Sequence, residues 1–143
     1  MTAFVSPQRI ADVMGLPQRI RSLSDLADAV RSGLPKSALK ASASRLFETA
    51  AAQTALINSV IPEATLKRRK DLLKPDESER TERLARVIAT AEYVWDDKED
   101  ARRFLTTPHS ELAGKRPVDV ALTELGARQI EELLWKLFYG LPI

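Results

Sequence analysis

The chain has 143 residues, enough for one domain or two small ones built around a hydrophobic core. It contains no cysteine and one histidine, His109, which excludes disulfides, thiolate metal sites, cysteine nucleophiles and any site that needs two histidines. No apolar run approaches the ~18 residues that a membrane span requires, and no segment resembles a signal peptide, so we expect a cytoplasmic protein without membrane association.

The net charge of +2 conceals an asymmetry between the two halves of the chain. Residues 1–70 carry 11 Lys and Arg against 5 Asp and Glu, a balance of +6, whereas residues 71–143 carry 11 against 15, a balance of −4. Opposite signs favour different partners, and the first half is expected to attract polyanions. The alternative is that charge merely fluctuates along a short chain.

The first 35 residues predict two short helices. In the first, Ser6 is the expected N-cap, Pro7 the first helical residue and Gly15 the stop. The second is expected to be capped by Ser24 and to end at Gly33. The spacing of three of its residues predicts that they face inward: Leu26, Ala27 and Val30.

Three more helices are predicted before residue 71. The first covers about 38–50, and its inward residues are expected to be Leu39, Ala43, Leu46 and Phe47. Two shorter helices, at 53–59 and 62–70, are separated by Val60-Ile61-Pro62. Because no alternating run of β-branched and aromatic residues occurs, we expect an all-α protein.

The helix at 62–70 ends in four contiguous cations, Lys67 to Lys70. A short helix, a tight turn and a basic second helix form the arrangement that enters a DNA major groove and pairs cations with phosphates. Glu63 and Ala64 occupy the early positions where Arg, Gln or Asn would contact bases, so phosphate contact is the better supported prediction. Alternatively, the cations only complement the dipole of the helix C-terminus.

A long helix is predicted from Pro75 to Trp95, and it connects the basic half to the acidic half. Its buried face is expected to comprise Leu84, Val87, Ile88, Ala91 and Trp95. On the outer face, two i,i+4 ion pairs are expected: Glu79 with Arg83, and Glu82 with Arg86.

The closing segment predicts a helix followed by an apolar tail. Its apolar stripe comprises Ile130, Leu133, Leu134, Leu137 and Phe138. Trp135 and Tyr139 lie off this stripe, one turn apart, while Gly140 is placed for a left-handed C-cap and Pro142 prevents continuation. An apolar tail suggests that a partner covers it. The alternatives are that the tail folds back on its own core and that the two aromatics form a second core face.

The last third of the chain contains four blocks in a specific order and spacing: VWDDKEDARRFLTTP at 94–108, LAGKRPVD at 112–119, TELGA at 123–127 and the Tyr139-Gly140 pair. Together they resemble the toxin-binding domain of the Xre/MbcA/ParS antitoxins. The family's Xre-like helix-turn-helix is similar to IPE at 61–63, TL at 65–66, RR at 68–69, ES at 77–78 and RLARV at 83–87. The resemblance covers roughly residues 22–142.

The resemblance implies an antitoxin that neutralises a RES-domain, NAD-consuming toxin by obstructing its cofactor pocket, and that autoregulates its operon by binding operator DNA. It implies a helix-turn-helix bundle joined by the long helix to a small helical toxin-binding domain. We therefore expect a helical extension at 1–21, a helix-turn-helix domain at 22–90 and a toxin-binding domain at 91–143. A homodimer and a hetero-oligomeric toxin–antitoxin complex are expected, and no cofactor.

The same resemblance, with the patterns above, selects two sets of binding residues. The expected DNA-binding residues are Thr65, Lys67, Arg68, Arg69 and Lys70. The expected toxin-binding residues are Trp135, Phe138, Tyr139, Gly140, Leu141, Pro142 and Ile143.

The chain departs from the family pattern at five positions. Phe104 stands where Trp is common, and His109, expected to be a loop or cap residue, stands where Asn is common. Ala113 replaces a common Gly, and Arg116 replaces a Thr whose oxygen would cap the short helix predicted at 117–122. Val60 replaces the usual turn glycine, so we expect either a different turn or backbone strain, and DNA binding is in question on that account.

Two other classes of protein are weighed against an antitoxin. A stand-alone helix-turn-helix regulator would need the basic helix but no exposed aromatic C-terminus. An enzyme would need a convergent catalytic or metal-binding set, and the clustered carboxylates are better explained as caps and dipole partners at a helix start: Asp96, Asp97, Glu99 and Asp100. We therefore expect no catalytic residues, no metal and no enzymatic activity.

Overall fold

The computed structural model describes residues 4–142, which form nine α-helices, one 3-10 helix and no β-strand. The prediction of an all-α fold is confirmed. The elements are α1 (Pro7–Val13), α2 (Leu23–Ser32), α3 (Lys36–Ser44), α4 (Ala50–Val60), α5 (Glu63–Lys67), α6 (Pro75–Trp95), α7 (Lys98–Thr106), η1 (Ser110–Leu112), α8 (Pro117–Val120) and α9 (Glu124–Phe138).

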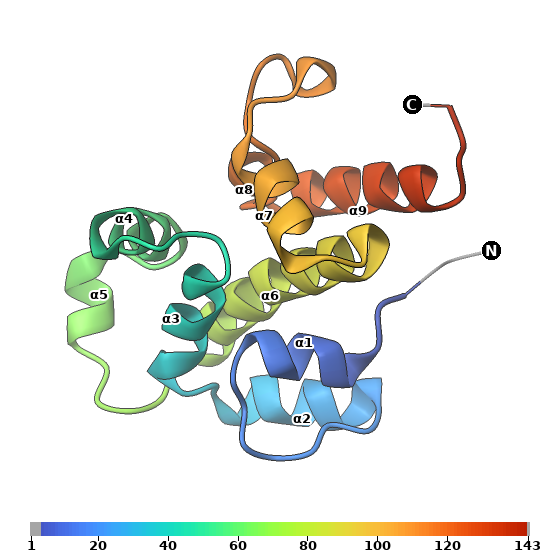
Figure 1. The fold of residues 1–143 in the computed structure, drawn as a ribbon. Helices are drawn as coiled ribbons and strands as arrows, with labels where there is room; N and C mark the ends of the chain where they lie inside the picture. The colour runs from blue at the N-terminus through green and yellow to red at the C-terminus, as the bar shows by residue number, and fades with distance from the viewer. Residues whose placement is uncertain (1–3, 143) are drawn as a thin grey trace.

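Helix α6 is the element on which the others assemble, and its predicted limits are confirmed. It packs against α1, α2, α3 and α4 on one side and against α7 and α9 on the other (Figure 1). Its predicted core residues Leu84, Val87, Ile88 and Ala91 are buried. The prediction for Trp95 is wrong, because Asp96 turns the chain with a φ of 52° and leaves the indole 39% exposed.

One of the two ion pairs predicted on α6 is present. Arg86 Nη1 lies 3.0 Å from Glu82 Oε1, as expected. Arg83 does not pair with Glu79; its Nε lies 3.2 Å from Oε2 of Glu124 instead. The reason is tertiary, since α9 begins beside this part of α6 and offers a carboxylate there.

The N-terminal helices follow their capping signals, with one correction. Ser6 caps α1 as predicted, and its Oγ accepts a hydrogen bond from the N–H of Arg9. Helix α2 is capped by Ser22, not by Ser24. Ser22 Oγ accepts from the N–H of Asp25 at 3.1 Å, while Asp25 Oδ2 accepts from the N–H of Arg21 at 2.9 Å, so two hydrogen bonds fix this start.

The predicted inward face of α2 is only partly observed. Leu26 is buried and Val30 is half-buried, but Ala27 is exposed. The side chain of Ala27 lies on the wall of a cleft described below, which is open to solvent on that side.

The helix predicted at 38–50 is interrupted. Helix α3 ends at Ser44, and Thr49 then caps α4 by accepting a hydrogen bond from the N–H of Ala52 at 3.2 Å. A strong cap at Thr49 favours a new helix in a new direction over a continuation of α3. The inward residues Leu39, Ala43 and Leu46 are nevertheless buried as predicted, and Phe47 is half-buried.

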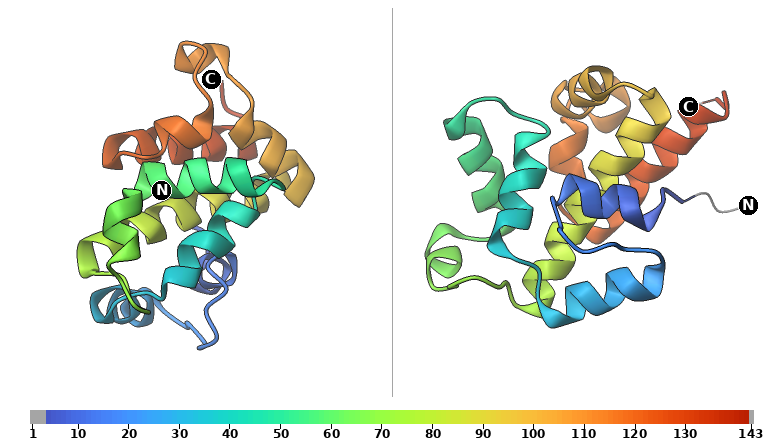
Figure 2. Two further views of the ribbon diagram at one scale, coloured as in Figure 1. Left: turned by 90° about the vertical axis from the view of Figure 1, so that its left-hand side faces the viewer. Right: turned by 60° about the horizontal axis from the view of Figure 1, so that its bottom comes forward.

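The C-terminal helices complete the core on the other side of α6. Buried residues from α7, α8 and α9 share one hydrophobic core with α6: Leu105, Val118, Ile130 and Leu134. Helices α4 and α5 lie at the opposite end of the molecule from the C-terminal end of α9 (Figures 1 and 2). Within residues 4–142, no helix has the length and apolar character to cross a bilayer.

Candidate functional site

Helices α4 and α5 are joined by a two-residue turn, Ile61-Pro62. Val60 is the last helical residue of α4, and Ile61 leaves it in an extended conformation with φ −134°. In the described chain only Asp96 and Ala113 are non-glycine residues with positive φ, so the turn differs from a glycine turn and Val60 is not strained. Arg80 Nη1 donates to the carbonyl of Val60 at 2.9 Å and satisfies the end of α4.

Helix α5 is shorter than predicted, because it ends at Lys67 and the following cations lie in a loop. This loop is tied to α3, where Lys36 Nζ donates to the carbonyl of Arg69 at 3.1 Å and Lys36 N–H donates to that of Asp71 at 2.9 Å. These bonds hold the loop beside α3 in place of further helical turns.

Four of the predicted DNA-binding residues lie on one accessible surface. Lys67, Arg68 and Lys70 are exposed, and Thr65 is half-buried. Lys67 Nζ lies 3.1 Å from the exposed carboxylate of Glu63, an ion pair that water and salt weaken. The side chains of this surface are therefore available to a polyanion.

Arg69 lies differently from its neighbours. Its guanidinium forms hydrogen bonds of 2.8 and 2.7 Å with the carboxylate of Glu77, and its side chain is 15% exposed. These hydrogen bonds lower the pKa of Glu77 to about 2. The structure therefore assigns Arg69 to an internal ion pair, and its neighbours carry the exposed charge.

At the other end of the molecule, α9 ends in the predicted glycine cap. Gly140 has a φ of +66°, and its N–H donates to the carbonyl of Leu137 at 3.2 Å. The N–H of Leu141 donates to the carbonyl of Lys136 at 2.8 Å, which completes a Schellman motif. The tail beyond it is exposed at Leu141 and Pro142, whereas Ile143 lies outside the described residues.

An aromatic cluster surrounds this end of α9. It comprises Tyr93, Trp135, Phe138 and Tyr139, with ring centroids 5.1–6.3 Å apart for the neighbouring pairs. Tyr93 is 39%, Phe138 44% and Tyr139 55% exposed, while Trp135 is half-buried.

These exposures decide between the alternatives for the C-terminal segment. Phe138, placed in the apolar stripe by its spacing, lies at the surface. With Leu141 54% exposed as well, the described tail does not fold onto the core, and the aromatics do not form a sealed second core face. The expected toxin-binding residues from Trp135 to Pro142 thus form one contiguous surface in space.

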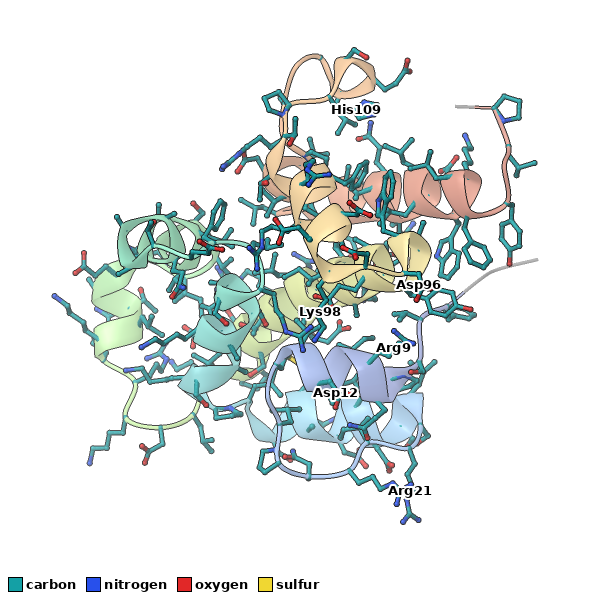
Figure 3. The ribbon with its side chains drawn as sticks, in the orientation of Figure 1. Arg9, Asp12, Arg21, Asp96, Lys98 and His109 are labelled. Carbon is teal, nitrogen blue, oxygen red and sulfur yellow. The ribbon has the colours of Figure 1, made fainter. Side chains whose placement is uncertain are left out.

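Sequence reasoning missed the members of this surface that come from other segments. Tyr93 lies off the buried stripe of α6, the same signal that singled out Trp135, but its contact with α9 is visible only in the fold. Arg9 of α1, labelled in Figure 3, lies over the Tyr93 ring, 5.1 Å from its centroid. Phe4, five residues before Arg9 in the chain, is 72% exposed.

A hollow of about 330 Å³ lies between α7 and α9. Its wall includes Trp95, Phe104 and His109, with Phe104 5.9 Å from the Trp95 ring and 6.1 Å from the His109 ring. His109 also caps η1 through Nδ1, which accepts from the N–H of Glu111 at 3.1 Å, so its predicted cap role is confirmed (Figure 3).

The two remaining departures from the family pattern are at Ala113 and Arg116. Ala113 has a φ of 56°, in the left-handed region that favours glycine. Arg116 makes no side-chain cap bond to α8, as expected, and forms instead two hydrogen bonds with Asp119, at 2.7 and 3.0 Å.

The clustered carboxylates at the start of α7 serve structural roles. Asp97 caps the helix by accepting from the N–H of Asp100 at 2.9 Å, and Asp100 pairs with Arg103 at 3.2 Å. Glu99 lies 3.4 Å from Arg102. In the part of the chain that the structure describes, no group of three or more acidic or histidine side chains is arranged to hold a metal ion.

Comparison with known proteins matches two family domains to this chain. The antitoxin Xre-like helix-turn-helix domain matches residues 25–86, and the antitoxin Xre/MbcA/ParS C-terminal toxin-binding domain matches residues 90–140. A Pseudomonas putida protein named Antitoxin Xre is 35% identical over 86 residues, which cover 58% of this chain and 54% of that relative. The matched region thus spans about half the length of that curated relative. Since both family models match in the expected order, the chain belongs to the Xre-type antitoxin family, with an Xre-like helix-turn-helix followed by an Xre/MbcA/ParS toxin-binding domain.

Proposed function

We propose that the chain neutralises a RES-domain toxin that consumes NAD, by docking the C-terminal end of α9 on the toxin and obstructing its active site. The observation that carries this proposal is the exposed aromatic cluster beside a sharply ended helix and an apolar tail. An exposed group of large apolar side chains is typical of a protein-binding surface.

The two parts of this surface are assigned different tasks. Trp135 and Tyr139 are anchors of the type that dominates interface energetics, and they are presented by a rigid helix. Leu141 and Pro142 follow Gly140 as an exposed, non-helical tail, and a single length of chain is narrow enough to enter a pocket. We propose that the aromatic anchors supply affinity and that the tail supplies obstruction.

We further propose that α4 and α5 bind operator DNA, with contacts to phosphates from Lys67, Arg68 and Lys70 and with Thr65 at the edge of the surface. Arg69 is assigned a positioning role through Glu77. Since α5 is short and carries Glu63 and Ala64 at its start, a single copy reads few bases, and recognition requires a homodimer or a larger toxin–antitoxin assembly.

The two proposed surfaces lie at opposite ends of the molecule (Figure 1). This arrangement allows one copy to hold toxin and DNA together, as autoregulation by the complex requires. We divide the chain into a helical extension at 1–21, a helix-turn-helix domain at 22–90 and a toxin-binding domain at 91–143, and we assign it a binding role in the cytoplasm and no catalysis.

The test uses the purified chain and the toxin encoded beside its gene. We expect a stable complex and full suppression of NAD consumption. Trp135→Ala and Tyr139→Ala should each weaken the complex by roughly 30-fold, the equivalent of about 2 kcal/mol at a hot spot. Leu125→Ala is the matched control, because Leu125 is 74% exposed at the opposite end of α9.

A stand-alone transcription regulator is the competing function. It predicts that the chain binds its operator normally and binds no toxin. Trp135→Ala should then leave operator binding unchanged. Specific DNA binding combined with a failure to bind the toxin would therefore replace the antitoxin proposal with that one.

A further inference from the structure

A cleft of about 440 Å³ adjoins the aromatic cluster and shares Trp135 with it. Helix α6 forms its floor, α2 forms one wall, α9 forms the other, and the segment before α1 closes one end. This volume falls in the range of natural binding pockets, roughly 300–1,000 Å³.

The walls of the cleft are apolar, and their rims are open to solvent. Phe4 and Leu23 stand on one side, 72% and 62% exposed, and Trp135 stands on the other. Such large exposed side chains are costly to leave in water, and they gather here and at the adjoining aromatic cluster. Trp135 belongs to both, so the cleft continues the proposed toxin surface.

The floor of the cleft carries unbalanced negative charge. Arg86 is shared by two carboxylates, with its Nη1 3.0 Å from Glu82 and its Nε 2.6 Å from Glu131. Glu79 adds a third carboxylate to the lining, and the second lining cation, Arg31, is exposed in a pair with Asp28 at 3.0 Å. Three carboxylates against two arginines leave the lining with a net charge of −1.

This arrangement favours a cationic occupant. The Glu82 side chain is 14% exposed, and burial raises its pKa above the ordinary value despite the neighbouring Arg86. A second cation in the cleft would relieve that cost, because it would meet a carboxylate that the protein has already desolvated.

The segment that completes the cleft is not part of either family match. Phe4, Val5 and Ile10 lie before residue 25, where the first match begins. Val5 and Ile10 are buried, so the N-terminal extension is packed firmly enough to present the Phe4 ring. The rest of the lining, from Leu26 to Trp135, falls within the two matches, so the N-terminal extension adds one apolar end to a cleft that the two family domains form.

We propose that this cleft is a second contact site for the toxin, and that it takes a Lys or Arg side chain of the toxin. The aliphatic stem of that side chain lies between Phe4 and Trp135, and its charge meets Glu82 and Glu131. The site rests on the proposed antitoxin function and gives it specificity, because a toxin without a cation at this place leaves the acidic floor unpaired.

A charge-removing and a wall-removing variant test this site. In the full chain, Glu82→Gln and Phe4→Ala should each weaken toxin binding about tenfold, and Glu82→Gln should also reduce the loss of affinity between low salt and about 0.5 M salt. The matched controls are Glu132→Gln, a 69% exposed carboxylate of α9 outside the cleft lining, and Leu125→Ala; both should bind as the parent chain does.

A fluorescent label gives a reading that does not depend on the stability of these variants. The chain has no cysteine, so Leu23→Cys accepts a single environment-sensitive dye on the rim of the cleft, and Leu125→Cys accepts the same dye elsewhere. Adding toxin should shift the emission of the dye at position 23 only.

Three results would overturn or separate the two proposals. Unchanged affinity of Glu82→Gln and Phe4→Ala, with no shift at position 23, overturns the cleft as a toxin site even though the parent chain binds toxin. If Trp135→Ala abolishes binding at the same time, the antitoxin proposal stands alone. If the parent chain itself binds no toxin, both proposals are rejected.

Discussion

The guanidinium of Arg69 meets the carboxylate of Glu77 in a paired arrangement, Nε to Oε1 at 2.8 Å and Nη2 to Oε2 at 2.7 Å. The Glu77 side chain is 3% exposed, and its Oε1 also accepts the N–H of Lys74 at 2.9 Å. The pair therefore joins the loop after α5 to the first turn of α6, and it orients the exposed cations on either side of Arg69.

Replacing one partner should destabilise the whole domain. Glu77→Gln leaves the half-buried Arg69 guanidinium without its counter-charge, and we expect the free energy of unfolding to fall by clearly more than in the control. The control is Glu63→Gln, which removes an exposed ion pair with Lys67 and should change stability by less than ~0.5 kcal/mol. Equal losses in urea denaturation would contradict this assignment.

The same pair should make stability depend on acid. The pKa of Glu77 is lowered from 4.5 to about 2, so the unfolded chain takes up this proton at a higher pH than the folded protein does. The stabilisation is therefore fully present above about pH 4.5 and is lost as the pH falls from there toward about 2. Denaturation at a series of pH values should show a shallower acid loss for Glu77→Gln, and identical slopes would refute the linkage.

Neutralising the exposed cations should weaken DNA binding in a salt-dependent manner. The triple variant Lys67→Gln, Arg68→Gln and Lys70→Gln should bind its own promoter less tightly. Its salt dependence should flatten by about one unit of slope for each DNA phosphate that the variant no longer neutralises. Binding is measured by fluorescence anisotropy across a salt series.

The control for this variant removes the same charge from the other domain. Lys98, Arg103 and Lys115 are exposed, and their replacement by Gln should leave the salt slope unchanged. If the triple variant at Lys67, Arg68 and Lys70 also keeps its DNA affinity and its salt dependence, the cations at those three positions serve only the dipole of α5.

Specific DNA binding should require more than one copy of the chain. One five-residue helix reads few base pairs, whereas a symmetric pair reaches half-sites about one helical turn apart. Native mass spectrometry of the protein–DNA complex should therefore show two or four chains per operator. Tight, sequence-specific binding by a single chain would reject this requirement.

Replacing Ala113, whose backbone is left-handed, by glycine should stabilise the protein. Ala113 has a φ of 56°, so Ala113→Gly should raise the free energy of unfolding by about 0.5–1 kcal/mol. Ala55→Gly in α4 is the control of opposite sign, because an exposed helical Ala→Gly change costs about 1 kcal/mol. Melting temperatures that fall for both variants would show that the backbone at Ala113 is not strained.

Much of the fold could be predicted because its signals are local. Pro75 and the acidic first turn define the start of α6, and Gly140 defines the end of α9, since caps and turns depend on a few adjacent residues. The prediction at Ser24 was wrong because Ser22 caps the N–H of Asp25 while Asp25 holds the N–H of Arg21, and a single-residue rule does not compare two possible caps.

The parts of the candidate site that were missed depend on contacts between distant segments. Tyr93 meets Trp135 only because α6 and α9 pack side by side, and Arg9 reaches that ring only because α1 lies against α6. The pairing of Arg69 with Glu77 crosses a loop, where helical spacing gives no guide to distance. Sequence patterns therefore identified the helix that carries the site but not the surface around it.

The aromatic residues are expected to determine the affinity for the toxin, whereas the tail is expected to determine how far NAD consumption is suppressed. Truncation after Gly140 removes the exposed Leu141 and Pro142 side chains and one cap hydrogen bond, from the Leu141 N–H to the Lys136 carbonyl. No buried side chain of the described residues is lost, so the fold and the toxin complex should persist. Trp135→Ala instead removes an anchor and should loosen the complex, as measured by its dissociation rate.

Obstruction of the toxin by the tail is tested most sharply by NAD consumption when the toxin is titrated with the chain truncated after Gly140. We predict that the truncated chain melts normally, binds the toxin nearly as tightly as the full chain, and leaves much of the NAD consumption intact. Complete suppression of NAD consumption by that truncated, normally folded chain would contradict obstruction of the active site by the tail.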